Sequence, residues 1–535
     1  MRTRSFAFLC ASLAGFAATP GEGQDHWTGW LYFPSGDVPI RMHVFGPDTG
    51  EPVAHVDLPA SGQIGVRFDS LELSEVALEL RHKDLVTLSG TRSNGHVEGS
   101  VDWYGERGHF ELHSSAVPLD WLAAVDAEPW VGIYRDGAGG LLVLSLSGWG
   151  ELKATDLQTG RIGILFPTGR DSVVLGPGFY VVDRVDLELR ALRTPEGAID
   201  ALLVIAPNDP AGTRFERVAL RESVLEIERA SARLEGVAVR IDDDVERPAV
   251  VLAGGSNWTT RKGLIERARI LAALGLVAVA YDKRGHGAST GEKVVPFAET
   301  GEDLVAWIGA LRRRPGVRPD RVGVYGISRG GWYGAHAAAH PDGADFFVSE
   351  VGASVTVATQ ETDARLEHLR RTGASHDVLD EATEYLRLLW EFARTGEGAD
   401  GYLAARARMQ ELGILEHVQG PAEIDDGTWL WSRLNAHVDP APWLAQVRGP
   451  ILAIYGSEDV PVNAWANASR LRTIRRPVQG GRLAIRVLQG ADHSLHSVLH
   501  DEQGRELRMH ARPGLHPDAW AVVRSWLADE VLELR

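Results

Sequence analysis

A chain of 535 residues, 44% hydrophobic and 24% charged, is long enough for two or three packed domains and has a globular composition, which excludes fibrous and disordered chains. The formal net charge of −18 leaves no basic surplus for phosphates. We therefore expect no electrostatic binding to nucleic acid or to an anionic membrane surface.

The N-terminus has the layout of a secretory signal peptide. Arg2 and Arg4 precede an apolar run from Phe6 to Ala18, and small and turn-forming residues follow through Gly23. The run is shorter than the ~20 residues of a transmembrane helix, and no later segment is long and uncharged enough to span a bilayer. We predict that residues 1–23 are cleaved and that the protein is secreted or periplasmic.

Cys10 is the only cysteine and lies inside this apolar run. Phe8 and Leu9 precede it where a lipoprotein signal has small residues, so we do not expect a lipid anchor. After cleavage the protein has no cysteine, which excludes disulfides, thiolate catalysis and cysteine-bound metals.

Short alternating stretches, separated by Gly, Pro, Asp and Asn, fill the chain from His26 to about Leu225 and predict antiparallel β-structure. A seam at 114–130 divides this half into two small, barrel-like modules, 24–116 and 117–227. Strands are expected at Trp27–Phe33, Ile40–Phe45, Gly65–Leu71, Val76–Leu80, Leu141–Leu146, Gly163–Phe166, Ser172–Leu175 and Leu202–Ile205. No catalytic cluster is recognisable, so we favour a passive scaffold or cap over a ligand-binding barrel.

From residue 228 to 535 apolar strands alternate with helical segments. Strands are expected at Ala249–Ala253, Val277–Tyr281, Val322–Tyr325, Phe346–Val348, Ile451–Tyr455 and Leu483–Leu488. Helices are expected at Lys262–Leu274, Glu302–Arg313 and Pro517–Leu534. This alternation predicts a mostly parallel sheet with helices on both faces.

The strands stop between about residues 361 and 436. Charged helical residues dominate there, with Trp390, Trp429 and Trp431 among them. We interpret the segment as an inserted helical lid that shapes a substrate pocket above the carboxyl edge of the sheet.

Gly326-Ile327-Ser328-Arg329-Gly330 follows the strand that ends at Tyr325 and opens onto a helix-compatible run. This is Gly-x-Ser-x-Gly in the strand–turn–helix context of a nucleophile elbow. The serine of an elbow sits at a strained turn that lifts its hydroxyl above the sheet, and the glycines let strand and helix approach. Ser328 is therefore the candidate nucleophile.

A serine hydroxyl needs a base, and an elbow of this kind takes its acid and then its histidine from later in the chain. Asp459 follows the strand that ends at Tyr455. We prefer it to Glu458 because Val460-Pro461 fixes the turn after it.

His493 follows the next strand, which ends at Leu488, and is the candidate general base. His496 and His500 lie further from the strand end and are less well placed. The order Ser, acid, His at three successive strand ends is what this chemistry requires.

The oxyanion hole is expected in the early loop Gly254–Trp258 and at the residue after the nucleophile. We assign one backbone N–H to Ser256, with Asn257 as second choice, and the other to Arg329. Two such amides would stabilise the negative charge of a tetrahedral intermediate.

The segment from Tyr281 to Gly291 resembles the Asp-x-Arg-Gly-x-Gly-x-Ser signature of serine aminopeptidase-like α/β-hydrolases, which include bacterial esterases, acyl-CoA thioesterases and lipases of monoacylglycerols. Gly326–Trp332 and Gly490–Ser494 resemble segments of exported bacterial α/β-hydrolases with a β-rich N-terminal region. The resemblance covers roughly residues 230 to 535. It implies the α/β-hydrolase fold with a helical lid, preceded by β-rich domains.

The chain departs from the family pattern at the expected oxyanion loop. The family usually has His-Gly-Ser-Gly at the oxyanion loop, whereas this chain has Gly254-Gly255-Ser256-Asn257. Backbone donors need no particular side chain. We expect Asp282 and Arg284 to form a buried structural pair that pins the neighbouring loop.

The sequence thus predicts a serine hydrolase that cleaves a small-molecule acyl ester through an acyl-enzyme. No cofactor and no metal are expected, since no metal-ligand motif is present. An aminopeptidase or acyl-peptide hydrolase and an acyl-CoA thioesterase remain alternatives, because the same triad serves all of them. A non-catalytic ligand-binding protein on a hydrolase fold is the alternative of another class.

Overall fold

The computed structural model describes residues 24–34, 36–46, 52–59, 63–83, 85–118, 124–147, 150–476, 482–499 and 514–532. The predicted signal peptide with Cys10, and His500, lie outside these residues. The chain divides into two compact units, residues 1–217 with 501–514 and residues 218–500 with 515–535.

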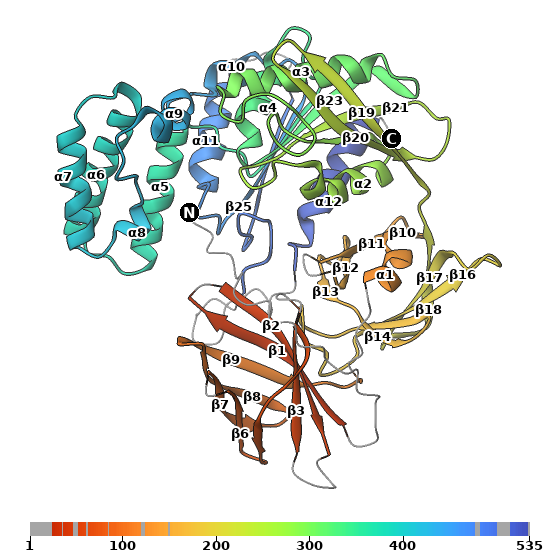
Figure 1. Cartoon of the computed structure of the whole chain (residues 1–535). Coiled ribbons are helices and arrows are strands. Elements are labelled where there is room, and N and C mark those ends of the chain that lie inside the picture. Colours follow the sequence, from red (N-terminus) through yellow and green to blue (C-terminus); the bar gives the residue numbers. More distant parts are fainter. Residues whose placement is uncertain are drawn as a thin grey trace. The chain divides into compact units, whose positions relative to one another are not determined.

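In its described part, the first unit contains two antiparallel sheets of nine strands each (Figure 1). The first sheet consists of β1 (Gln24–Phe33), β2 (Gly36–Phe45), β3 (Val53–Leu58), β4 (Gln63–Arg67), β5 (Ser70–Leu73), β6 (Ala77–His82), β7 (Val86–Ser93), β8 (His96–Trp103) and β9 (Glu106–Ser114). Its order is β4-β3-β2-β1-β9-β8-β7-β6-β5. Most neighbours are therefore consecutive in the chain, as short antiparallel connections allow.

The second sheet follows the short helix α1 (Ala124–Ala127) and the 3-10 turn η2 (Glu128–Trp130). It consists of β10 (Gly132–Asp136), β11 (Leu141–Leu146), β12 (Leu152–Asp156), β13 (Ile162–Ile164), β14 (Phe166–Gly169), β15 (Ser172–Leu175), β16 (Leu187–Arg193), β17 (Ile199–Ala206) and β18 (Asp209–Arg217). Its order, β13-β12-β11-β10-β18-β17-β16-β15-β14, repeats that of the first sheet. In both sheets the first strand pairs with the last, and the fourth and fifth strands are the edges.

Both faces of β1 are buried. Trp27 and Leu31 point into the core of the first sheet. Trp30 and Tyr32 point the other way and pack in a cluster with Tyr180 of the second module. The alternation along this strand therefore gives each face a different apolar partner.

The second unit is built on an eight-stranded sheet of β19 (Leu220–Arg229), β20 (Ala232–Ile241), β21 (Arg247–Ala253), β22 (Val277–Tyr281), β23 (Val317–Ile327), β24 (Phe347–Glu350), β25 (Ile451–Gly456) and β26 (Leu483–Leu488). Among the described residues its order is β19-β20-β22-β21-β23-β24-β25-β26. The strands from β22 to β26 are parallel, and β19 and β20 join antiparallel. The mostly parallel sheet predicted from the sequence is confirmed.

The unit boundary differs from the predicted one. The sequence analysis places residues up to 227 in the second β-rich module, whereas the division falls after Arg217. β19 pairs along its whole length with β20 and so belongs to the second unit's sheet. Its alternating pattern is that of an antiparallel strand, and such a pattern does not reveal which sheet receives the strand.

Helices cover both faces of this sheet (Figure 1). On one face lie α2 (Ile265–Ala273) and α12 (Asp518–Leu527), where Arg267 lies over the Trp520 ring. On the other face lie α3 (Phe297–Arg312), α4 (Gly330–Ala339), α10 (Ala441–Gln446) and α11 (Ala464–Arg475). Within the described residues, no helix is both long and apolar enough to cross a bilayer.

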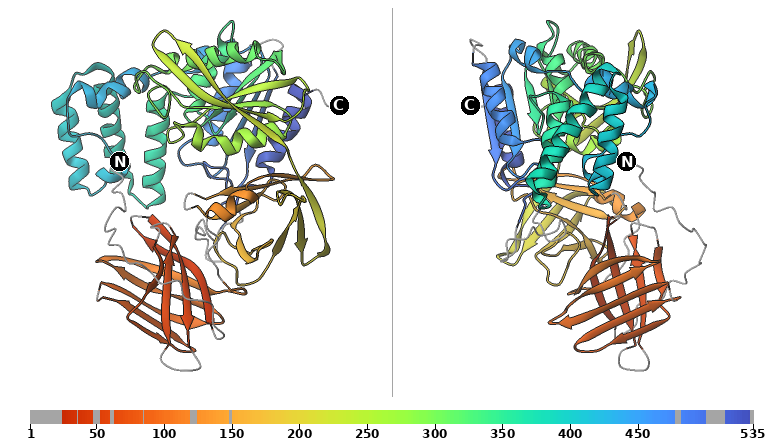
Figure 2. Two further views of the ribbon diagram at one scale, coloured as in Figure 1. Left: turned by 45° about the vertical axis from the view of Figure 1, so that its right-hand side comes forward. Right: turned by 90° about the vertical axis from the view of Figure 1, so that its left-hand side faces the viewer.

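Between β24 and β25 the chain forms the predicted helical insertion, seen as the teal bundle in Figure 2. It consists of α5 (Val357–Arg371), α6 (His376–Thr395), α7 (Ala399–Glu411), α8 (Leu415–Val418) and α9 (Asp426–Asn435). The Ser375 and Asp425 side chains cap α6 and α9 by accepting backbone N–H groups of the first turn. Tyr385, Tyr402 and Trp429 form the centre of its own apolar core.

Two predicted strands are each split in two. Gly65–Leu71 is interrupted at Phe68, whose N–H donates to Ala54 on β3 before β5 begins. Gly163–Phe166 is interrupted at Leu165, after which β14 pairs with β15 instead of β12. An alternating pattern does not show where a strand changes its partner.

Candidate active site

Ser328 sits at a sharp turn between β23 and α4. Its φ is +52°, and its N–H donates to the Glu350 carbonyl at 2.8 Å. A Cβ at Gly330 would overlap the Ala253 carbonyl oxygen, and one at Gly326 would clash with the Gly330 carbonyl group. The glycines are therefore required by close approach, as the elbow pattern predicts.

A buried ionic group supports the elbow from below. The Glu350 carboxylate accepts hydrogen bonds from Arg267 and from the Tyr325 hydroxyl. Arg267 lies between the rings of Trp258, Tyr325 and Trp520. The contact between Arg267 and Glu350 was not predicted, because no spacing in the sequence links α2 to β24.

The structure brings the three residues predicted to form the triad together. His493 Nε2 lies 3.0 Å from Ser328 Oγ, and His493 Nδ1 lies 2.8 Å from Asp459 Oδ2. The Asp459 side chain is fully buried, and its other oxygen accepts the Val462 N–H at 2.6 Å. The tight turn after Asp459 thus fixes the carboxylate.

Glu458, the competing acid, points elsewhere. Its carboxylate lies 3.7 Å from Arg371 of α5, with the side chain 37% exposed. Its backbone N–H donates to Ala491. Among the described residues only Asp459, of these two acids, contacts His493.

The loop that carries His493 is held by its neighbour Asp492. The Asp492 carboxylate accepts the backbone N–H groups of Ser494 and His496, and its own N–H donates to the His496 carbonyl. His496 forms a bridge with Leu515. This compact turn presents His493 to Ser328.

The Asp459 carboxylate determines which ring nitrogen of His493 carries the proton. Burial raises the pKa of the Asp459 carboxyl, and the hydrogen bond from His493 opposes this. An ionised carboxylate only accepts hydrogen bonds, so Nδ1 of His493 donates to Asp459. Nε2 then carries a lone pair that can accept the Ser328 hydroxyl proton.

The loop after β21 lies against Ser328. An ideal Cβ on Gly255 would stand 3.2 Å from Ser328 Cβ and 3.8 Å from Ser328 Oγ. In the part of the chain that the structure describes, neither the Ser256 N–H nor the Arg329 N–H donates to another protein group. Both predicted oxyanion-hole donors are therefore free, and so is the N–H of the second choice, Asn257.

Lys283, inside the Asp-x-Arg-Gly motif, also reaches this loop. Its Nζ donates to the Gly255 carbonyl at 2.7 Å and lies 5.2 Å from the centre of the Tyr333 ring. Burial, with a smaller contribution from Arg329, lowers the pKa of the Lys283 ammonium to about 7. Because Lys283 occupies the first variable position of the motif, it was not predicted to belong to the site.

The Arg329 side chain is a second cation at the site. Its guanidinium lies 4.5 Å from the centre of the Trp431 ring of α9. Within the described ranges, no carboxylate lies within 4 Å of it. The carboxylate of Glu361, whose charge acts on Arg329, is paired with Arg365 at 3.5 Å.

The expected Asp282–Arg284 pair does not form, and this prediction was wrong. Asp282 accepts the backbone N–H groups of Arg261 and Ala288, at 2.7 and 2.9 Å. Arg284 instead binds Asp303 of α3 with two hydrogen bonds. Both residues are buried and structural, but the turn between them directs their side chains to different elements.

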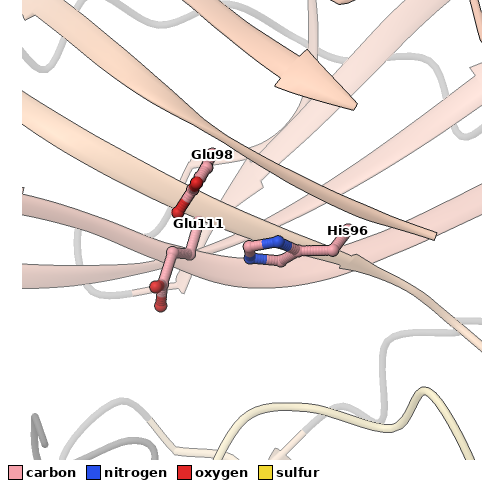
Figure 3. Close-up of side chains that lie close together, drawn as sticks. All are labelled: His96, Glu98 and Glu111. Carbon is pink, nitrogen blue, oxygen red and sulfur yellow. The ribbon is translucent and has the colours of Figure 1, made fainter. Parts of the chain in front are cut away.

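A possible metal-binding group lies in the first unit. His96, Glu98 and Glu111 each bring one donor atom to within 4.8 Å of the others, side by side on β8 and β9 (Figure 3). Glu98 stands opposite Glu111 in the register. Cross-strand pairs have no fixed spacing in the sequence, so the motif search could not find them.

A strained serine at the elbow of a mostly parallel sheet, with a histidine and a carboxylate from later strand ends, defines an α/β-hydrolase. The family model described as X-Pro dipeptidyl-peptidase (S15 family) matches residues 196–491, more than half of the chain. The protein belongs to this family and is a hydrolase of the serine type. The predicted membership of the α/β-hydrolase superfamily is confirmed.

Solved structures with a similar fold include the esterase Pf2001 of Pyrococcus furiosus, at 15% identity and a TM-score of 0.36, covering 58% of this chain and 92% of that one. The α/β hydrolase GrgF from Penicillium sp. sh18 has 17% identity, a TM-score of 0.33 and coverage of 51% and 91%. A 2,6-dihydroxy-pseudo-oxynicotine hydrolase has 17% identity, a TM-score of 0.37 and coverage of 58% and 68%. These likenesses are too distant to indicate a substrate. No protein of curated function matches the sequence.

Proposed function

We propose that this protein is a carboxylesterase that cleaves small acyl esters, with Ser328 as nucleophile, His493 as general base and Asp459 as the group that orients it. The observation that carries the proposal is the continuous chain of contacts Ser328–His493–Asp459, at 3.0 and 2.8 Å. Among the described residues the N–H groups of Ser256 and Arg329 have no protein acceptor, and the residues that precede them, Gly255 and Ser328, lie close together.

In this mechanism Ser328 Oγ attacks the acyl carbon while His493 Nε2 takes the hydroxyl proton. The carbonyl oxygen becomes an oxyanion, which accepts hydrogen bonds from the N–H groups of Ser256 and Arg329. His493 then gives its proton to the leaving alkoxide, and an acyl-enzyme remains. Water, deprotonated by His493, attacks the acyl-enzyme, and His493 returns this proton to Ser328 Oγ as the acid is released.

The family name favours a second candidate, cleavage of a dipeptide from the N-terminus of a peptide. Such a peptidase must bind the ammonium group of its substrate. Here Arg329 and Lys283 bring two cations beside the nucleophile, and neither has a carboxylate within 4 Å among the described residues. Like charges disfavour an ammonium group, which supports a substrate without one.

Labelling with a fluorophosphonate probe tests the nucleophile. We expect labelling of the wild type and none of Ser328→Ala. Labelling of Ser328→Ala at the wild-type rate would contradict the assignment.

A substrate panel tests the bond. It compares p-nitrophenyl acyl esters, acyl-CoA thioesters and Gly-Pro p-nitroanilide by kcat/KM. We expect the esters to be the best substrates. Faster cleavage of the anilide would establish the peptidase, and faster cleavage of the thioesters would establish a thioesterase.

We also propose that the protein is exported and that its signal peptide is cleaved. The layout of residues 1–23 supports it. Fractionation of cells that express the full chain, with sequencing of the N-terminus of the recovered protein, tests it. Recovery of uncleaved protein from the cytoplasm would contradict it.

A further inference from the structure

Two consecutive carbonyl groups of the loop after β21 are held by side chains. The Tyr333 hydroxyl donates to the Gly254 carbonyl, and Lys283 Nζ donates to the Gly255 carbonyl at 2.7 Å. Tyr333 lies on α4, directly after the nucleophile, and Lys283 follows β22. The loop is thus held by groups from two different elements.

The second of these bonds determines where the next N–H points. The described chain contains no cis peptide bond, so the peptide between Gly255 and Ser256 is trans. In a trans peptide the C=O and N–H groups point in opposite directions. With the Gly255 carbonyl facing Lys283, the Ser256 N–H faces away from Lys283. Gly255 itself lies against Ser328.

Lys283 has no other polar role among the described residues. Its side chain makes no ion pair there, and its hydrogen-bond acceptor is the Gly255 carbonyl. Its backbone N–H donates to Thr259, which anchors it beside the same loop. Burying an ammonium group without a counter-ion costs folding free energy, so we looked for a function that explains Lys283 at this position.

We propose that Lys283 is a positioning residue of the oxyanion hole, which by holding the Gly255 carbonyl turns the Ser256 N–H toward the oxyanion formed at Ser328. This rests on the proposed function. The ammonium polarises the same peptide and adds positive potential beside the oxyanion, so that it acts more strongly on the transition state than on the bound ester.

The charge of Lys283 makes this role dependent on pH. Its pKa of about 7 means that the ammonium becomes a neutral amine as the pH rises through neutrality. The groups that face it are Arg329 and Tyr333 from α4, while the neighbouring Asp282 and Arg284 are bonded to other elements. The neutral amine still donates to Gly255, so we expect a several-fold decrease of kcat above pH 7 and no complete loss.

The test compares the wild type with Lys283→Met, Lys283→Arg and the exposed control Lys262→Met. Hydrolysis of a neutral p-nitrophenyl ester is followed from pH 6 to 9, and the melting temperature of each variant is recorded. For Lys283→Met we expect kcat to decrease by about 10- to 100-fold with KM nearly unchanged. We expect Lys283→Arg to recover much of kcat without the decrease above pH 7, and Lys262→Met to match the wild type.

Three results would overturn the inference. They are an unchanged kcat in Lys283→Met, a change confined to KM, and an alkaline decrease that persists in that variant. Each leaves the proposed hydrolase intact as long as Ser328→Ala is inactive and the wild type is active. No ester turnover by the wild type would instead overturn the proposed function, and the inference with it.

Discussion

The parallel sheet of the second unit and the antiparallel sheets of the first gather their polar groups in different ways. In the parallel sheet, β23, β25 and β26 end at one edge, so loops that are 34 to 165 residues apart in the sequence bring Ser328, Asp459 and His493 together. In the antiparallel sheets, neighbouring strands run in opposite directions. Polar side chains there meet across the register on one face, as His96, Glu98 and Glu111 do. Convergence at an edge brings reactive groups to one point, whereas pairs across a register are spread along the face of a sheet.

The sharpest test of this comparison is the nucleophile. Ser328→Ala removes the attacking oxygen at the convergent edge, and we expect kcat for an ester to decrease by about 10⁶-fold, because the rest of the triad cannot act without it. Steady-state kinetics with a p-nitrophenyl ester measures the effect, and circular dichroism serves as the folding control. Residual activity above one part in a hundred would mean that another group is the nucleophile.

The next largest effect is expected at the acid. Asp459→Asn replaces an acceptor with an amide and favours the wrong tautomer of His493, so we expect kcat to decrease by about 10⁴-fold. Glu458→Gln, at the adjacent residue, is the matched control and should change kcat by less than about twofold, since Glu458 faces Arg371. A reversed ranking of the two variants would show that the loop rearranges when substrate binds.

A stability effect is expected beneath the elbow. Glu350→Gln leaves the Arg267 guanidinium, whose side chain is 19% exposed, without a full counter-charge, and we expect a loss of about 3 kcal/mol in the free energy of unfolding. Glu222→Gln is the control, because it breaks the partly exposed pair with Arg269, two residues further along α2. That change should cost about 1 kcal/mol or less. Urea denaturation of both variants measures the difference, and equal losses would contradict the assigned role of Glu350.

The smallest effect is expected at His96, Glu98 and Glu111 of the first unit. The double variant His96→Ala, Glu111→Gln keeps an acceptor for the Tyr32 hydroxyl, which donates to Glu111 at 2.9 Å. Since we predict that the β-rich half is a passive scaffold, kcat/KM of the full chain should change by less than about twofold, with or without a divalent cation. A loss of turnover would show that these residues take part in the function.

Much of the second unit could be predicted from the sequence. Buried parallel strands are nearly continuous apolar runs, and each of the three residues predicted to form the triad follows such a run directly. The turn at Ser328 needs glycines at fixed positions, which makes its pattern specific. Asp459 could be preferred to Glu458 because a rigid turn follows it. In the structure this turn places the Val462 N–H where it donates to the Asp459 carboxylate.

Contacts between elements could not be predicted in the same way. In the sequence Lys283 looks like any exposed lysine, and only its contact with Gly255 in the structure shows its position at the site. The Glu350 carboxylate likewise could not be recognised without its partner Arg267, which lies on a distant helix. For Asp282 and Arg284 the charges suggested a pair, but the turn between them sends each side chain to its own partners. The alternating pattern of β19 fits either unit. Each of these outcomes depends on which elements pack together, and local patterns do not carry that information.

The helical insertion enters and leaves the second unit at one point. The Ala358 N–H at the start of α5 donates to the Ala436 carbonyl directly after α9, at 2.8 Å. A segment whose ends meet, and which encloses its own apolar core, behaves as a cassette. It can be exchanged or shortened without stretching the strands on either side. A change within the insertion can therefore leave Ser328, Asp459 and His493 where they are.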